Sequence, residues 1–574
     1  MPAIFVVVAV LGAFFLAYRF YSAYLAEKVY ALDKSFETPA HEFEDGVDYV
    51  PTNKHVLFGH HFTSVAGAAP IVGPAIAAFW GWLPALLWIT FGTIFAAGVH
   101  DFGSLVVSVR NRGQNIGTLS SGVISNRART LFLIILFFLL TLVNAVFGVV
   151  MAILFEANPG AVIPAVAIIP IAIVIGQFAY RGRGPILIPA IIAVALLYAL
   201  IPVGQLLPIQ VDGLASVFGI EARTLWVILI FAYTWFASRL PVWLLLQPRD
   251  YINSFQLFIA LGVIFLGIAV GFDTIAAPAI NSNVPAGSPS IFPFLFITIA
   301  CGAISGFHTL VASGTSSKQL DNEEDARYVG YMGALGEGSL ALGSLLAVTA
   351  GLGATAAWQQ NYPDFATASG GAVGYFTQGV GSFAGNLGIP ETVGVIFAAV
   401  VVITFAGTTM DTGIRLQRYI IQEIGEITNI RPLTRNVTLT TSIGVLIPLG
   451  LALYPGGDRG GDAGFVFGYL WRLFGTTNQL TAGLALTVIA IYVFTRGRNF
   501  IVQLVPLVFL LSMTVYALFL QLGQFYNEGS WLLLVVDAII FILSVWLIVE
   551  AIVAFQKARG NRGQEVANRG GDDE

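Results

Sequence analysis

The stretch HHFTSVAGAAPIVGP at residues 60–74 decides the fold, because it places two prolines and two glycines inside an apolar segment. Proline removes a backbone donor and clashes with the preceding helical turn. Non-helical backbone at membrane depth is tolerated only where it lines a protein cavity. We therefore predict that a membrane-spanning helix opens near Gly67–Pro74 and exposes carbonyl groups and a half-helix amino end.

A second stretch of this kind is CGAISGFHTLVASGTSS at residues 301–317, with three glycines and many hydroxyl groups. In the expected order of spans the two stretches lie seven spans apart, so they run in opposite directions through the membrane. Oppositely directed broken helices indicate an inverted-repeat transporter with its site near the midplane. The alternative is that each stretch is a kinked packing helix with close glycine contacts.

The composition predicts an all-α polytopic membrane protein. The chain has 574 residues, of which 57% are hydrophobic and 10% are charged, whereas soluble domains have about 25% charged residues. A helix needs about 20 apolar residues to cross the hydrocarbon core. Segments of this character, about fifteen in all, lie at 2–24, 62–80, 83–108, 131–155, 161–180, 185–202, 223–246, 255–272, 291–316, 327–354, 391–412, 436–454, 476–495, 500–522 and 530–555.

The distribution of lysine and arginine predicts the orientation, because positive residues concentrate in cytoplasmic loops. If the amino end lies outside and the spans alternate, most positive residues fall in inner loops or in the carboxyl-terminal tail. We therefore predict an inner (cytoplasmic) membrane protein with its amino end outside and its carboxyl end inside. The inner residues are Arg110, Arg112, Arg127, Arg129, Arg181, Arg183, Arg249, Lys318, Arg327, Arg415, Arg418, Arg431, Arg435, Arg496, Arg498, Lys557, Arg559, Arg562 and Arg569, and the outer ones are Arg223, Arg459 and Arg472.

The domain organisation follows from these spans. We expect an N-terminal transmembrane helix, a solvated cytoplasmic linker, a transporter domain with a terminal helix, and a disordered tail. The loop at 355–390 has too many glycines for a stable span, so it is either a re-entrant or lid-like loop or a floppy outer loop. The predicted bounds are 1–24, 25–59, 60–555 with repeats at about 60–272 and 291–522 and the terminal helix at 530–555, and 556–574.

Glu337 is the candidate proton-coupling carboxylate, because ionisable residues within spans are costly and usually functional. It lies near mid-depth of 327–354, between Gly336 and Gly338. Structural pairing with an arginine is the alternative.

Three further ionisable side chains lie inside spans. His100 and Asp101 are adjacent, and neighbouring helical residues point about 100° apart, so we expect them to contact different helices. A histidine near a carboxylate can transfer protons in the physiological range, but a structural aspartate at a helix end is equally compatible. His308, in the second broken stretch, is a candidate substrate or proton contact.

Two pairs near span ends have simpler explanations. Asp411 and Arg415 have i,i+4 spacing, which predicts a local salt bridge or gate. Asn478 and Gln479 enter a span after three small residues, and helix capping explains them most simply. Both pairs are therefore assigned gating or structural roles.

The broken stretches supply the candidate substrate contacts. A substrate carboxylate would lie at a half-helix amino end, and unwound carbonyls could hold a cation. A sodium-coupled alternative would use carbonyls near Gly67–Val72 and the hydroxyls of Ser313 and Thr315. The candidate substrate-binding residues are His61, Ser64, Gly67, Ala68, Pro70, Ser305, His308, Thr309 and Ser313.

Several function classes lack support. The single cysteine, Cys301, excludes a disulfide framework and a cysteine-based metal site. His60 and His61 diverge on a helix without a spaced set of other ligands, so we expect no metal and no cofactor. The sequence has no phosphate-binding loop, so we expect neither a primary pump nor an enzyme. It has no basic patch either, so we expect no nucleic-acid binding. A membrane sensor or a redox subunit that uses the histidines is the alternative from another class, and the sequence does not indicate an oligomeric state.

Several blocks resemble the carbon starvation protein A (CstA) family, in the family's order across roughly residues 55–490. They are FGHHFTSVAGAAPIVGPAIAAFWGWLPALLW, GTIFAAGVHDFGSLVVSVRNRGQ, CGAISGFHTLVASGTSSKQL, YMGALGEGSLAL, SGGAVGYF, TTMDTGIRLQRYIIQE and LWRLFGTTNQLTAGLAL. The resemblance implies a secondary transporter with LeuT-like inverted repeats that imports peptides, or pyruvate by proton symport. It maps onto His60–Pro74, His100–Asp101, Ser305–Ser317, Glu337 and Asp411.

The sequence also departs from the family pattern. It reads Ser316-Ser317-Lys318 where members often have Thr-Pro-Lys, and the chain is short for the family. LeuT-like repeats contain five helices, so the seven-span separation implies an inserted pair, for which 161–202 is the candidate. The leading interpretation is alternating-access import of a small organic solute, coupled to protons through Glu337 with His100 and Asp101 or His308.

Overall fold

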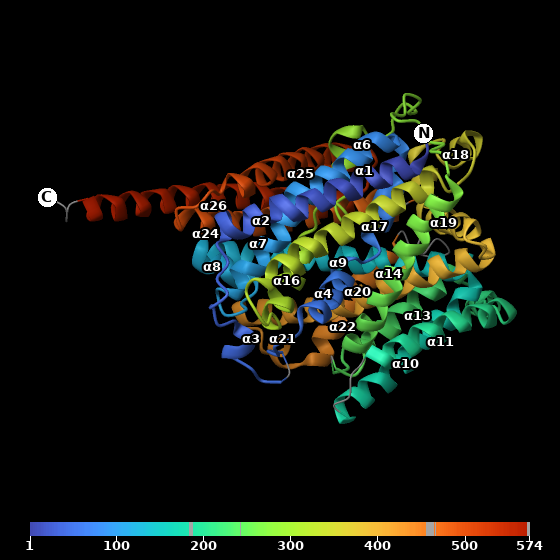
Figure 1. The fold of residues 1–574 in the computed structure, drawn as a ribbon, viewed down its shortest axis with the longest axis horizontal. Coiled ribbons are helices and arrows are strands. Elements are labelled where there is room, and N and C mark those ends of the chain that lie inside the picture. Colours follow the sequence, from blue (N-terminus) through green and yellow to red (C-terminus); the bar gives the residue numbers. More distant parts are fainter. Residues whose placement is uncertain (47, 183–186, 242, 455–463, 465, 571–574) are drawn as a thin grey trace.

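The computed structural model describes the chain except residues 47, 183–186, 242, 455–463, 465 and 571–574. In these described ranges the regular elements are helices, and strand-like pairing is limited to two isolated β-bridges. The longer helices lie side by side along the long axis of the molecule (Figure 1). This confirms the all-α architecture.

The helices that build the bundle have the following bounds. They are α1 Ala3–Leu16 (continuing as helix to Tyr30), α4 Lys54–Val65, α5 Ala69–Ala77, α6 Trp82–Gly92, α7 Gly98–Val109, α8 Ile116–Val123, α9 Asn126–Ala157, α10 Val162–Gly182, α11 Leu187–Leu206, α12 Asp212–Phe218, α13 Ala222–Ala237, α14 Leu246–Gly271, α15 Ile291–Thr298, α16 Gly306–Gly314, α17 Met332–Thr349, α20 Glu391–Ile427, α22 Val437–Ala452, α24 Trp471–Thr495, α25 Ile501–Asn527 and α26 Trp531–Gly570. Shorter or peripheral helices are α3 Pro39–Glu42, α18 Thr355–Asn361, α19 Phe365–Asn386 and α21 Arg431–Arg435.

Fewer than the predicted fifteen helices have the length and composition of a membrane span. Eleven helices of the described chain are long and apolar enough to cross a membrane, and thirteen qualify if each of two bent pairs counts as one span. The other two predicted segments correspond to the interrupted stretch α15–α16 and to the short helix α22. The chain is thus a polytopic membrane protein, but the count of fifteen is not confirmed.

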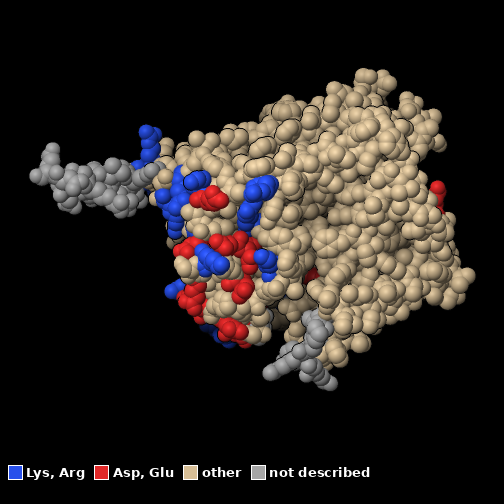
Figure 2. All heavy atoms as spheres, viewed as in Figure 1, with Lys and Arg blue, Asp and Glu red and all other residues tan. Residues whose placement is uncertain are grey.

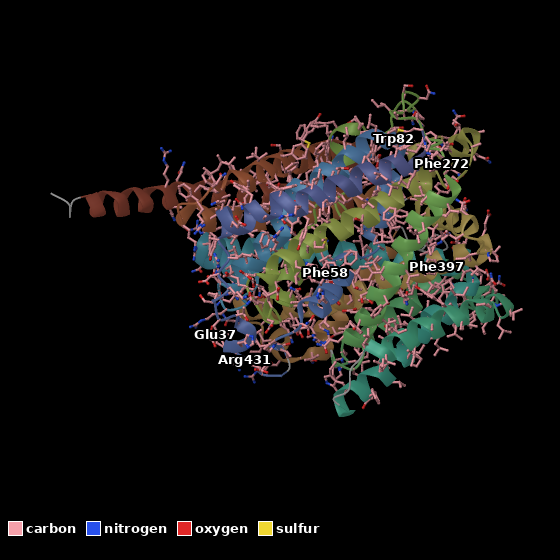
Figure 3. The ribbon with its side chains drawn as sticks, viewed as in Figure 1. Glu37, Phe58, Trp82, Phe272, Phe397 and Arg431 are labelled. Atoms are coloured by element: carbon pink, nitrogen blue, oxygen red, sulfur yellow. The ribbon has the colours of Figure 1, made fainter. Side chains whose placement is uncertain are left out.

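The two ends of the bundle differ in charge. Most charged side chains visible in Figure 2 gather at one end, over α3, α8 and α21. We call this end, which holds Glu37 and Arg431, the charged face, and the opposite end, which holds Trp82 and Phe272, the amino-end face (Figure 3). The chain starts at the amino-end face, where the Ala3 amide donates to the Asp273 carbonyl over 2.8 Å. Arg183 and Arg459, which entered the predicted charge distribution, lie outside the described residues.

The glycine-rich segment 355–390 is an ordered helix rather than a floppy loop. Within it, α19 spans 22 residues. The Phe365 ring packs on Trp80 at one end of α19, and at the other end the Asn386 amide donates to Asp273 over 2.7 Å. Both ends of α19 therefore lie at the amino-end face, so the helix covers that face and does not cross the membrane. Its glycines permit close packing, since a Cβ on Gly379 would lie 2.0 Å from the Ala347 carbonyl oxygen.

The linker after the first helix is held in place instead of being freely solvated. It occupies residues 31–53, because the first helix continues to Tyr30 and α4 begins at Lys54. The Thr52 amide donates to the Gln319 carbonyl over 3.0 Å, and Asp33 donates its amide to Glu323 over 2.6 Å. This segment is therefore attached to the chain that follows α16 at the charged face.

The last helix extends beyond its expected end. The sequence favours a disordered tail from residue 556, whereas α26 continues to Gly570 and projects from the charged face (Figure 1). Residues 571–574 lie outside the described structure.

Candidate functional site

The first predicted break lies between α4 and α5 at residues 66–68, whereas the rest of the predicted opening, up to Pro74, is helical. Helix α4 ends at Val65, α5 begins at Ala69, and the two halves are bent by 48°. Ala66 has a ψ of 59°, which no α-helix allows. Pro70 lies in the first turn of α5, where its missing donor costs nothing. Among the described residues no side chain caps the amino end of α5.

The second predicted break is the segment 299–305 between α15 and α16, where Gly302 has a φ of +93°. Backbone groups at this depth need partners inside the protein. Side chains of neighbouring helices supply them: Trp88 donates to the Ile299 carbonyl over 3.0 Å, and Thr93 donates to the Gly302 carbonyl over 3.1 Å. The break is thus a built feature of the bundle.

Asn478 and Gln479 serve this second break, and the prediction that they cap their own span is wrong. Both are buried within α24, which begins at Trp471. The Asn478 Oδ1 accepts from the Phe307 amide over 3.0 Å, and so occupies the amino end of α16. Gln479 donates to the Phe296 carbonyl over 2.6 Å. Asn478 therefore caps a helix as predicted, but that helix is α16 and not the span to which Asn478 belongs.

Four fully buried titratable side chains form one connected group, which we call the central cluster: His100, Asp101, His308 and Glu337. Asp101 Oδ1 lies 2.6 Å from His100 Nδ1, and Asp101 Oδ2 lies 2.8 Å from His308 Nδ1. His308 Nε2 lies 3.3 Å from Glu337 Oε1. The expectation that His100 and Asp101 contact different helices is therefore only half right, because Asp101 binds its neighbour and α16 at once.

Thr309 extends the central cluster on the far side of His100. Its hydroxyl lies 2.8 Å from His100 Nε2 and 2.9 Å from the Ser104 hydroxyl. His100 is thereby held by a hydrogen-bonding partner at each ring nitrogen, which fixes the plane of its ring.

Glu337 joins the central cluster to the second break. Its Oε1 accepts from the Gly302 amide over 2.9 Å, so the carboxylate holds the unwound segment directly. In the described part of the chain the titratable side chain that contacts Glu337 is His308 and not an arginine. Any movement of residues 299–305 therefore changes the surroundings of this carboxylate.

A small cavity lies between the two breaks. Its volume is about 10 Å³, which is room for about one water molecule. Four lining residues, Val143, Phe147, Thr409 and Phe474, were not singled out from the sequence, because apolar and hydroxyl side chains within spans give no distinctive signal. The remaining lining residues come from the breaks themselves: Ser64, Val65, Gly67, Ala69, Cys301, Ser305 and Phe307.

Of the predicted substrate contacts, Ser64, Gly67 and Ser305 line this cavity. His308 and Thr309 belong to the central cluster instead. The others are buried elsewhere in the breaks: Ala68 and Pro70 at the start of α5, His61 with its Nδ1 2.8 Å from the Ser316 hydroxyl, and Ser313 with its hydroxyl donating to the Thr309 carbonyl.

A comparison with protein families and with known proteins agrees with these features. The model of the family "Carbon starvation protein CstA" matches residues 2–365 and 351–517. This chain belongs to the CstA family. It is 33% identical to a peptide transporter CstA of Campylobacter jejuni over 92% of this chain and 82% of that one. It is 32% identical to the pyruvate/proton symporter BtsT of Escherichia coli over 91% of this chain and 82% of that one.

Two solved structures have a limited similarity to this CstA-family chain. A manganese transporter mutant of Eremococcus coleocola has 13% identity and a TM-score of 0.47, and covers 90% of this chain and 98% of that one. MhsT in complex with L-phenylalanine has 12% identity and a TM-score of 0.46, with 87% and 99% covered.

In this CstA-family chain the predicted pair of Asp411 with Arg415 is wrong. Asp411 Oδ2 lies 2.8 Å from Arg249 Nη2 on α14 and accepts from the Tyr233 hydroxyl on α13 over 2.9 Å. Arg415 instead donates to the Leu240 carbonyl over 2.6 Å. A fully buried carboxylate needs a close positive partner, and the packing of α14 against α20 supplies Arg249 in that position.

Proposed function

We propose that this chain is a secondary active transporter that imports a small organic nutrient, a peptide or a pyruvate-like carboxylate, by proton symport. The names of the relatives, a peptide transporter and a pyruvate/proton symporter, support this class. The observation that carries the proposal is the segment 299–305, which contributes Cys301 and Ser305 to the cavity and the Gly302 amide to Glu337. A solute and a coupling carboxylate would then contact the same unwound segment.

The pattern of helix contacts supports inverted repeats. Helix α4 contacts α14, and correspondingly α15 contacts α24; α7 contacts α16, and correspondingly α17 contacts α5. Helices α9 and α20 pack against each other, α9 also contacts α24, and α20 also contacts α14. If residues 54–271 are superposed on residues 291–495, each of these helix contacts coincides with its counterpart from the other repeat. Helices α10 and α11 are then an insertion in the first repeat. Alternating access in such transporters moves one set of helices against the other around a fixed site.

The free half-helix end indicates where a substrate carboxylate would bind. The amino end of a helix attracts anions, through its unpaired amides and its dipole. Asn478 occupies the amino end of α16, whereas the start of α5 has no capping side chain, and Ala69 there lines the cavity. The carboxylate would therefore bind at the amino end of α5.

The charges of the central cluster explain how a proton would accompany an anion. Asp101 and Glu337 carry two negative charges when ionised, and His308 contacts both of them. If one histidine is protonated, the central cluster still carries one net negative charge. A buried uncompensated charge is costly. A bound proton neutralises it, and movement of residues 299–305 around a substrate would change the proton affinity of Glu337. The membrane orientation that fits is amino end outside and charged face inside, because positive residues favour the cytoplasmic side.

The test is transport by purified protein in proteoliposomes, with labelled pyruvate and with labelled di- and tripeptides. We expect uptake of at least one of these that follows an inward proton gradient and is unchanged when sodium is replaced by choline. Sodium-dependent uptake would favour the alternative coupling ion. One observation weighs against the alternative sodium site. The Ser313 hydroxyl already donates to the Thr309 carbonyl and accepts from the Ile116 amide.

A further inference from the structure

A second group of buried and half-buried polar side chains lies between α4, α13, α14 and α20, apart from the central cluster. His60 Nδ1 is 3.5 Å from Asp250 Oδ2. Arg249, next to Asp250 on α14, contacts Asp411 as described, and it also donates to the Tyr233 hydroxyl over 2.7 Å. We call these five residues the inner cluster.

The inner cluster lies towards the charged face. Helix α4 begins at Lys54, whose amine is 3.7 Å from Asp325 at that face. His60 is six residues further along, which places it about 9 Å deeper at 1.5 Å per residue. Asp250 lies in the second turn of α14, and this helix ends beside Phe272 at the amino-end face (Figure 3), so it begins towards the charged face. The inner cluster is therefore between the central cavity and the charged face.

One stripe of α4 connects this group to the cavity. Val56, His60 and Ser64 follow each other at i,i+4 spacing and so share a helix face. Val56 is 42% exposed, the His60 side chain is 20% exposed, and Ser64 lines the cavity. In Figure 2 the surface is hollowed in the region of α4, and an acidic side chain is visible inside the hollow. The stripe thus leads from the surface past His60 to the cavity.

The inner cluster contains side chains of both charges. Asp250 and Asp411 are acidic and Arg249 is basic, and Arg415 lies one turn from Asp411 on α20. The group that contacts His60 is Asp250 on α14. Arg249 beside it pairs with Asp411 from α20 and with Tyr233 from α13, and His61 is next to His60 on α4. The Asp250 carboxylate therefore gives the His60 imidazole a close negative neighbour.

Several atoms of the inner cluster also lack hydrogen-bond partners. Among the described residues, His60 Nε2, Asp250 Oδ1 and Asp411 Oδ1 are buried without one. Buried polar atoms of a purely structural pair are normally satisfied. These atoms are therefore free to accept a proton or a hydrogen bond from water that enters along α4.

We propose that His60 and Asp250 form a second proton station, through which the proton held at the central cluster leaves towards the charged face. This inference deepens the proposed function and rests on it. When the cavity opens along the Val56–Ser64 stripe, the proton leaves the His308–Glu337 pair, reaches His60 Nε2 through water, and passes from the imidazolium to water at the charged face. His60 and Glu337 each return to their starting charge, so the steps transfer one proton and nothing else.

The experiment compares two transport modes in proteoliposomes, using pyruvate or a dipeptide that the wild-type protein takes up. His60→Gln and Asp250→Asn are expected to lower uptake driven by a proton gradient about tenfold or more, the scale of a lost proton-transfer group. Counterflow at equal pH should change less than about twofold, because exchange returns the carrier with its proton still bound. His55→Gln, an exposed histidine on the same helix, should behave as wild type in both modes.

Each outcome decides the inference. Wild-type rates of proton-driven uptake in both variants would overturn the second station and leave the proposed function intact. Wild-type uptake that ignores the proton gradient would overturn both. Equal loss of both modes would show a structural role, and Asp250→Glu checks this, because it keeps the carboxylate and should retain proton-driven uptake if the station exists. The melting temperature of each variant in detergent separates loss of folding from loss of transport.

Discussion

Replacement of Glu337 by glutamine is expected to abolish uptake driven by a proton gradient. Glutamine keeps the size of the side chain and its carbonyl oxygen can still accept from the Gly302 amide, but it cannot take up or release a proton. Counterflow of substrate at equal pH should persist, because exchange does not require the proton to leave. We expect proton-driven uptake to fall about 100-fold, the scale of a lost proton-transfer group.

The measurement is uptake of labelled substrate with and without an imposed pH gradient, beside counterflow in the same vesicles. Glu391→Gln, at the exposed start of α20, is the matched control and should leave both modes unchanged. Proton-driven uptake at the wild-type rate in Glu337→Gln would remove this carboxylate from the coupling mechanism.

Replacement of Gly302 by alanine is expected to abolish both proton-driven uptake and counterflow. Its φ of +93° is unfavourable for any residue with a side chain, and the added Cβ would lie 2.6 Å from the Cβ of Ala341. Strain of this kind costs about 1–3 kcal/mol. The unwound segment would have to shift, and with it the amide that binds Glu337 and the two side chains that line the cavity.

Gly314→Ala is the matched control, because a Cβ at Gly314 meets no atom within 4 Å. Both variants are assayed for uptake, counterflow and melting temperature. The loss of both modes in Gly302→Ala would distinguish this geometric defect from the selective defect of Glu337→Gln. Full transport by Gly302→Ala would mean that the second break can change its backbone without consequence for the site.

The sequence predicted the two breaks and singled out the residues of the central cluster, because each violates a rule of the membrane interior. Prolines and glycines in an apolar span must open the helix or face a cavity, and the breaks lie at residues 66–68 and 299–305. Ionisable residues are rare at mid-depth, so Glu337, His308 and Asp101 stood out. Their mutual contacts were not predictable, because they depend on how three helices pack.

Other features carry no such signal. Phe147 and Phe474 line the cavity, but apolar residues fill every span of this chain. Asp411 lies one turn from Arg415, yet its partner is Arg249, which is distant in sequence and is brought close only by tertiary packing. Gly379 lowers helix propensity, but its close contact with α17 favours the helical form of α19 in the folded protein.

The inner cluster was missed for a related reason. Asp250 lies near the start of a helix, where polar residues are common and do not indicate a function. The sequence places His60 in the first broken stretch and beside His61, which suggests at most a metal pair, whereas its neighbour in the structure is a carboxylate on another helix. Contacts between distant segments again decide the assignment.

The central claim is that a substrate binds between the two breaks, and Cys301 allows a direct measurement. It is the single cysteine of the chain and it lines the cavity. We expect a small methanethiosulfonate reagent to modify Cys301 in functional membranes, and a saturating transported substrate to slow the reaction about fivefold or more by occupancy of the site, with Cys301→Ser as the unlabelled control. An identical labelling rate with and without substrate would contradict a binding site at this position.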